Sequence, residues 1–138
     1  MSVLRPYAPA LDRLRGVGLR PTRQRLALAR MLFDKGHCHV TAEELHRQAR
    51  EANVRVSLAT VYNTLHQFTD NGLLREVIVD SGCSYFDTNT SEHHHFLHEE
   101  SGRLEDIPTD SVRVVNLPEP PAGTTVKRVD LVVRLTKK

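Results

Sequence analysis

Two short helical segments joined by a brief turn constrain the fold of this chain more than any other feature. The first segment opens with Thr41-Ala42-Glu43-Glu44 and runs to about Glu51. This opening is a capping box, in which the threonine and the second glutamate satisfy each other's free backbone amides. The second segment opens at Ser57, a favoured N-cap residue, and ends at Asn71-Gly72. With the turn at residues 52–56 between them, the two segments predict a helix-turn-helix.

The segments on either side of this pair predict a winged helix. Two further helices come first, at residues 8–16 and from the end of Pro21-Thr22 to about Lys35, and glycines follow both. After the pair, residues 73–79 and 84–87 read as two strands of a hairpin across Asp80-Ser81-Gly82. A hairpin placed directly after a recognition helix is a wing.

The exposed side of the second helix offers groups that suit DNA. Hydroxyls near a helix start bind phosphates, an asparagine can read a base edge, and a tyrosine can pack on a thymine methyl. The side chains predicted to contact DNA from this helix are Ser57, Thr60, Tyr62, Asn63 and Thr64. Arginines crowd the first two helices, and those predicted to hold the phosphate backbone are Arg13, Arg15, Arg23 and Arg25. The alternative is the solvated face of an ordinary helical bundle.

The charge of the chain is divided unevenly between its halves. Residues 1–72 carry 11 Lys and Arg against 6 Asp and Glu, whereas residues 73–138 carry 8 against 11. A basic first half followed by an acidic second half indicates one module for a polyanion and another module for a different ligand. Ordinary surface charge is the alternative.

Three consecutive histidines, His93, His94 and His95, are the strongest ligand signal outside the helices. Side chains alternate on an extended segment, so His93 and His95 would share a face and His94 would point away. Two imidazoles on one face, joined by carboxylates, begin a transition-metal site. A solvated loop is the alternative for such a run.

Composition limits the class of protein. No apolar run is long enough to cross a bilayer, and the two cysteines form no CxxC pair, so we expect a cytoplasmic protein without a membrane partner. We expect no enzyme, because the chain offers no glycine-rich loop and no nucleophile motif. The rival in that class is a small metal hydrolase that uses Asp87, His93 and His95.

Several local motifs carry a family resemblance. They are GLRPTRQR at 18–25, HVTAEEL at 39–45, VSLATVYNTL at 56–65, and SYFDTN at 84–89 followed by EHHHF at 92–96. The chain resembles the ferric uptake regulator (Fur) family, and most of all its iron response regulator (Irr) branch. The resemblance implies an α+β protein with a winged-helix DNA-binding domain at 1–88 and a small α/β dimerisation and sensing domain at 89–138. It implies a homodimer or higher oligomer on AT-rich double-stranded operator DNA, which controls iron and haem genes in response to metal or haem. The alternative within the family is a peroxide-sensing repressor that uses Fe(II) or Mn(II).

The resemblance also assigns ligands, residue by residue. The family's inter-domain metal site matches His39, Asp87, His93, His95 and Asp106. Imidazole and carboxylate ligands suit iron, manganese or zinc. The first two would come from one domain and the others from the second, so a bound ion would fix the angle between the domains.

Other family features are altered. The structural zinc site needs CxxC, and because the matching positions are His98 and Ser101, we expect that site to be absent. A second site in the dimerisation domain would use His94, but Arg113 stands where a partner carboxylate belongs. The Irr branch implies haem sensing, for which His94 is the candidate axial ligand, with His93 and His95 beside it. Pro118-Glu119-Pro120-Pro121 interrupts the family's C-terminal helix, which leaves a short helical turn at 109–114 and a strand at 126–135.

Overall fold

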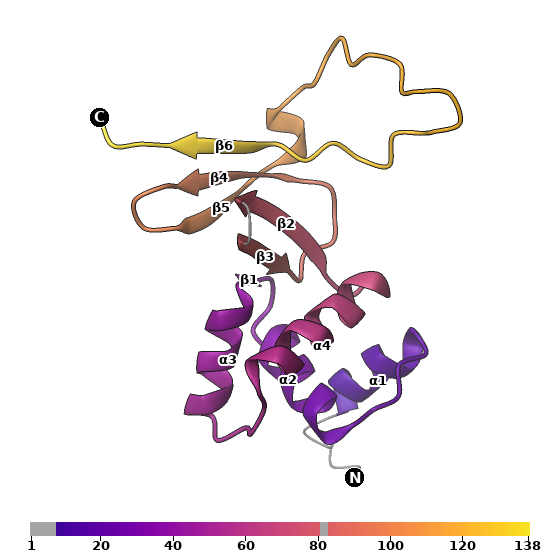
Figure 1. Cartoon of the computed structure of the whole chain (residues 1–138), viewed down its shortest axis with the longest axis vertical. Helices are drawn as coiled ribbons and strands as arrows, with labels where there is room; N and C mark the ends of the chain where they lie inside the picture. Colours follow the sequence, from indigo (N-terminus) through magenta and orange to yellow (C-terminus); the bar gives the residue numbers. More distant parts are fainter. Residues whose placement is uncertain (1–7, 81–82) are drawn as a thin grey trace. The chain divides into compact units, whose positions relative to one another are not determined.

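The computed structural model describes residues 8–80 and 83–138, and these fall into two compact units (Figure 1). The N-terminal unit ends at Thr90 and the C-terminal unit begins at Ser91. Each unit has a small sheet of its own. The two are described separately below.

The helices of the N-terminal unit begin and end close to the predicted residues. Among the described residues they are α1 (Ala8–Gly16), α2 (Arg23–Phe33), α3 (Ala42–Glu51) and α4 (Leu58–Asp70). Three hydroxyl side chains cap them: Thr22 accepts a hydrogen bond from the amide of Arg25, Thr41 from that of Glu44, and Ser57 from that of Thr60. After α4, Gly72 adopts a left-handed conformation with φ of 79°, which lets the chain turn away.

The predicted hairpin follows α4. Strands β2 (Arg75–Asp80) and β3 (Cys83–Asp87) pair antiparallel, and β1 (His39–Val40) adds to the other side of β3, so the strand order is β1-β3-β2. The predicted turn includes residues 81 and 82, which lie outside the described residues. Strand β2 begins two residues later than predicted, because the Leu73 amide still donates to the carbonyl of Phe68 in α4.

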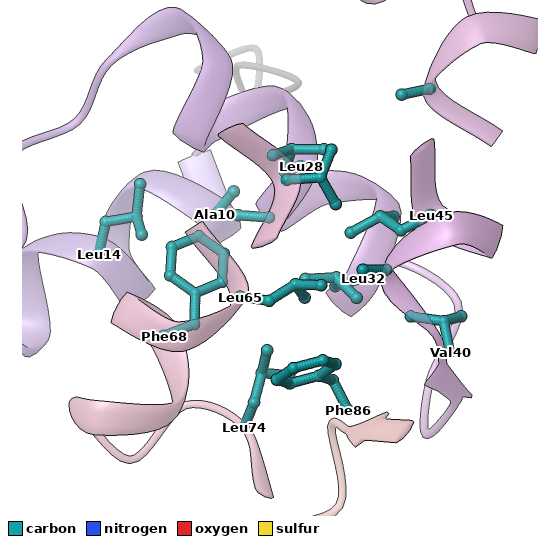
Figure 2. Packing of buried hydrophobic residues seen from close by; sticks show 14 residues of the cluster. Ala10, Leu14, Leu28, Leu32, Val40, Leu45, Leu65, Phe68, Leu74 and Phe86 are labelled. Carbon is teal, nitrogen blue, oxygen red and sulfur yellow. The ribbon is translucent and has the colours of Figure 1, made fainter. Parts of the chain in front are cut away.

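One continuous apolar core fixes the helices and the sheet of this unit (Figure 2). Leu65 and Phe68 of α4 are fully buried, as are Leu28 and Leu32 of α2 and Leu45 of α3. Phe86 of β3 closes the cluster on the sheet side. Side chains from α4 and β3 therefore contact the same core.

The C-terminal unit is a three-stranded sheet in the order β5-β4-β6. Strands β4 (His94–His98) and β5 (Arg103–Ile107) form an antiparallel hairpin, and β6 (Val132–Leu135) pairs parallel with β4. The predicted helical turn is present as the short 3-10 segment η1 (Thr109–Ser111). The predicted strand at 126–135 is wrong in its first half, since only Val132–Leu135 pairs with a neighbouring strand.

Candidate metal centre and nucleic-acid interface

In the C-terminal unit, two histidines and one aspartate bring their ligand atoms together. His95 of β4 lies directly opposite Asp106 of β5, so both side chains stand on the same side of the sheet. The Nε2 atoms of His93 and His95 lie 3.5 and 3.4 Å from the same Oδ1 of Asp106. The two imidazole rings are 4.5 Å apart, centroid to centroid. One ligand atom from each of the three residues lies within 4.8 Å of the others, as binding to a single cation requires.

A backbone contact prepares His93 for ligation. Its Nδ1 lies 2.7 Å from the carbonyl oxygen of Ser91. A carbonyl oxygen only accepts, so Nδ1 carries a proton, and Nε2 is the nitrogen that a metal ion would bind. This arrangement, in which the second ring nitrogen donates to a carbonyl, orients the histidine ligands of many metal sites.

The N-terminal unit presents the other two predicted ligands together. His39 and Asp87 lie directly opposite each other across the β1–β3 pair. The residues next to them in the chain, Cys38 and Thr88, form two hydrogen bonds with each other. The Thr88 amide donates to the Cys38 carbonyl at 2.9 Å, and the Cys38 amide donates to the Thr88 hydroxyl at 2.9 Å. The ring of His39 also meets the ring of Tyr85 edge to face, with 6.0 Å between centroids. One sheet therefore fixes the positions of both an imidazole and a carboxylate.

The chemistry of these groups fits a divalent transition metal. Nitrogen and carboxylate oxygen together suit Fe(II), Mn(II) and Zn(II), whereas copper(I) favours sulfur. Within the C-terminal unit, His93, His95 and Asp106 would hold such an ion together, and within the N-terminal unit His39 and Asp87 offer one imidazole and one carboxylate.

His94 stands on the opposite side of β4 from its two neighbours, as predicted. Its Nδ1 accepts a hydrogen bond from the backbone amide of Leu131 at 3.1 Å, and its side chain is buried. The proton of the neutral ring is therefore on Nε2. Ligation of haem iron through Nε2 would move this proton to Nδ1 and break the bond to Leu131.

The positions that match the family's zinc-binding CxxC carry different contacts. His98 Nε2 lies 3.0 Å from a guanidinium nitrogen of Arg103 and 3.4 Å from Glu105. Arg103 and Glu105 also form an ion pair of 3.2 Å. The arginine cation beside the imidazole opposes a second cation, and the serine at position 101 supplies no useful zinc ligand.

Not all of the side chains of α4 that were predicted to contact DNA are accessible to solvent. Ser57 and Asn63 are exposed, and Thr60 and Tyr62 are half-buried. Thr64 is only 5% exposed, so its prediction as a DNA contact is wrong. It lies one helical turn from Val61 and Phe68, on the side of α4 that packs into the core.

The phenol of Tyr62 has a partner on the neighbouring helix. Its hydroxyl donates to Glu43 Oε1 at 2.8 Å. This hydrogen bond to a carboxylate is the main reason that the pKa of Tyr62 is raised above the ordinary value. Sequence reasoning missed this contact, because the two residues are 19 positions apart.

The four predicted phosphate-binding arginines are not equivalent. Arg15 and Arg23 are exposed, and Arg13 is exposed with its guanidinium 4.5 Å from the centre of the Phe33 ring. Arg25 is half-buried, donates to Gln67 Oε1 at 3.2 and 2.9 Å, and donates to the carbonyl of Arg20 at 2.7 Å. Its guanidinium therefore joins α2 to α4.

Two arginines beside the helix-turn-helix turn were not predicted. Arg50 and Arg55 line a surface hollow together with His46, next to the start of α4. His46 is fixed there by a contact of 3.1 Å between its Nε2 and the Val56 carbonyl. Their position on either side of residues 52–54 could have indicated phosphate contacts from the sequence, because the first helix of such a motif crosses the DNA backbone.

Comparison with known proteins identifies the family of the chain. The sequence profile described as the ferric uptake regulator family matches residues 16–133. The chain belongs to this family. Its members are transcription regulators and not enzymes.

The relatives differ in what their names say they sense. The peroxide-responsive repressor PerR of Staphylococcus aureus is 38% identical over 94 residues, which are 68% of this chain and 63% of that repressor. The chain therefore spans less than two thirds of the length of this curated relative. The ferric uptake regulator of Pseudomonas aeruginosa, solved with manganese, superposes with a TM-score of 0.69 and 27% identity, covering 94% of this chain and 98% of that one. The Vibrio cholerae ferric uptake regulator gives 0.70 and 24%, covering 90% and 96%.

These neighbours confirm the predicted fold class, a winged helix followed by a small α/β domain. Membership of the family is also confirmed, while the iron response regulator branch stays a prediction. No helix among residues 8–80 and 83–138 is both long and apolar enough to span a membrane.

Proposed function

We propose that the chain is a DNA-binding regulator, active as a homodimer, whose operator binding is governed by a divalent ion of iron, manganese or zinc. The residues that would hold the ion are His39, Asp87, His93, His95 and Asp106. The observation that carries the proposal is the meeting of the His93 and His95 Nε2 atoms at one oxygen of Asp106. The pairing of His39 with Asp87 in the other unit supports the proposal, because these two side chains would supply the remaining ligands.

The division of the ligands between the units gives the proposal its mechanism. His39 and Asp87 belong to the unit that contains α4 and the wing hairpin, and the other three ligands belong to the second unit. A bound ion supplies positive charge and directional bonds that hold both sets of ligands at once. Ligation would then select one arrangement of the two DNA-binding units within a dimer, which is a population shift.

The DNA side of the proposal rests on α4. Ser57, Thr60, Tyr62 and Asn63 would contact AT-rich operator DNA, while Arg13, Arg15 and Arg23 would bind phosphates. Because a homodimer has two-fold symmetry, its operator would be a pair of inverted half-sites. By resemblance to iron response regulators, the controlled genes would serve iron and haem metabolism.

Metal analysis of anaerobically purified protein tests the proposal. We expect the double variant His93→Ala/His95→Ala to lose its bound metal and the metal dependence of its operator gel shift. His98→Ala changes a histidine on the same strand outside the ligand set, and it should keep the metal. Retention of the full metal stoichiometry by the double variant would refute the site.

A second candidate function is peroxide sensing, which the similarity to PerR of Staphylococcus aureus favours. In this case hydrogen peroxide would oxidise a ligand histidine of the Fe(II)-loaded protein. One oxygen atom of the peroxide would be transferred to the ring, and the other would leave as water. Mass spectrometry of the peptide that contains His93 and His95 tests this directly. An unmodified peptide after peroxide treatment of Fe(II)-loaded protein rejects the candidate, and the Mn(II)-loaded protein is the control.

Haem sensing is a third candidate function, which the resemblance to iron response regulators suggests. Titration of the metal-free protein with haem, followed by absorbance and by operator gel shift, tests it. If His94 is the axial ligand, His94→Ala will remove the absorbance change. An identical change in the variant excludes His94 from haem binding.

A further inference from the structure

The tyrosine of α4 is held from two directions. Its hydroxyl donates to Glu43 of α3 at 2.8 Å, in a contact exposed to solvent. Its ring stacks on that of His66, one helical turn further along α4, with 6.4 Å between centroids and 17° between planes. These two contacts restrain both the position of the phenol and the rotation of the ring.

The carboxylate that holds the hydroxyl is itself well placed. Glu43 is in the first turn of α3, two residues after the Thr41 cap. A negative side chain is favoured there by the unpaired amides and the positive end of the helix dipole. Glu43 therefore lies on the first helix of the helix-turn-helix while it orients a side chain of the second.

A fixed acceptor matters for a residue that reads bases. A phenol on an exposed helix face otherwise samples several rotamers, and ordering it on binding costs free energy. A side chain whose rotamer is locked by a neighbouring hydrogen bond meets the base edges already in place.

We infer that Glu43 is a positioning residue for DNA recognition, which holds the Tyr62 phenol in the orientation that contacts bases. The inference rests on the proposed function, because it takes α4 to be the reading helix. A carboxylate near the DNA also repels phosphates, so Glu43 weakens binding to every sequence while it favours the operator. Glu43 thus raises the ratio of operator affinity to non-specific affinity at the expense of overall affinity.

Two substitutions separate the geometry from the charge. Glu43→Gln removes the charge but keeps an oxygen that accepts the phenol proton, whereas Glu43→Ala removes both. The measurement is the affinity of the metal-loaded protein for an operator duplex and for a scrambled duplex of equal length, at one salt concentration. We expect Glu43→Ala to lower the affinity ratio about fivefold, the value of one ordinary hydrogen bond. Glu43→Gln should bind both duplexes more tightly and keep the ratio within about twofold of the wild-type ratio.

A double-mutant cycle with Tyr62→Phe tests whether Glu43 acts through the hydroxyl. In the Tyr62→Phe background, Glu43→Ala should leave the affinity ratio unchanged. An equal fall of the ratio in both backgrounds overturns the inference, as does an unchanged ratio for Glu43→Ala alone. A loss in Glu43→Gln as large as that in Glu43→Ala also overturns it, because the charge would then be the cause.

Absorbance titration of the phenols gives a readout without DNA. The difference between wild-type protein and Tyr62→Phe isolates the ionisation of Tyr62, whose pKa should fall toward its ordinary value when Glu43 is replaced. A raised pKa that persists in Glu43→Ala excludes the contact. Failure of the proposed function has a different signature: Tyr62→Ala, still folded by circular dichroism, would keep the full operator preference.

Discussion

The two units of the chain bury very different amounts of apolar surface. The N-terminal unit has a continuous core of 14 buried side chains drawn from helices and sheet. In the C-terminal unit the buried hydrophobic residues are Leu97, Leu104 and Ile107. Four of the five exposed large hydrophobic residues of the described chain belong to it, namely Val114, Val115, Leu117 and Val126. Such a small unit needs further interactions for its stability, and metal ligation and association are the usual ones.

Loss of a core side chain from each unit is the strongest test of this comparison. Phe68→Ala should lower the free energy of unfolding by about 3–5 kcal/mol, because a fully buried ring leaves a cavity among helices. Leu104→Ala should cost about 2 kcal/mol, since it has fewer apolar neighbours to lose. Urea unfolding at several protein concentrations measures both. Equal losses, or a midpoint for Leu104→Ala that does not vary with concentration, would contradict the comparison.

Metal should stabilise the weaker unit. Manganese at a hundred times its dissociation constant should raise the free energy of unfolding by about 2.7 kcal/mol. Asp87→Asn should reduce this gain if the N-terminal unit contributes a ligand, whereas Asp70→Asn, on the exposed end of α4, serves as the control. Calorimetry with and without manganese measures the gain. A full gain in Asp87→Asn would confine the ligands to the C-terminal unit.

Two adjacent residues of α4 should separate recognition from stability. Asn63 is exposed, so Asn63→Ala should weaken operator binding by about 1–3 kcal/mol and leave unfolding unchanged. Thr64 is buried, so Thr64→Ala should lower the free energy of unfolding by roughly 1 kcal/mol and leave the operator affinity of the folded protein unchanged. Gel shifts measure the operator affinity of both variants, and thermal unfolding measures their stability. The reverse pattern would mean that the face of α4 has been misassigned.

The arginines give the smallest expected effects. Arg23→Ala should reduce the slope of log affinity against log salt by about 0.9, the value for one lost phosphate contact. Arg25→Ala should instead lower the free energy of unfolding by about 1 kcal/mol, because its guanidinium binds Gln67 within a half-buried contact. Salt titrations of operator binding separate the two. An equal reduction in slope for Arg25→Ala would show that Arg25 also contacts a DNA phosphate.

Local signals in the sequence predicted most of the N-terminal unit. Caps at Thr22, Thr41 and Ser57 satisfy the amides a few residues ahead, so they can be read without knowledge of the fold. Thr64 was misassigned because a polar side chain concealed which side of α4 packs inward. The partners of Arg25 and Tyr62 lie 42 and 19 residues away, and no local pattern reveals such contacts.

The C-terminal unit was harder to predict for a related reason. The alternating residues before Val132 suggest a long strand, but strand length also depends on a neighbour with which to pair. The Leu131 amide instead donates to the ring of His94. For the metal ligands, alternation along the chain correctly separated His94 from His93 and His95. The meeting of those two with Asp106 depends on the pairing of β4 with β5, which the histidine spacing alone does not specify.

The length of the short turn between β4 and β5 determines which residues of the two strands lie opposite each other. The turn joins His98 to Arg103 and thereby places Asp106 opposite His95. One inserted residue that shifted the register by one would turn the aspartate to the other side of the sheet, away from both histidines. A shift of two residues would restore the side but move the carboxylate along the strand by about 7 Å. Length variants of this turn should therefore lose the ligand set even when every ligand residue is kept.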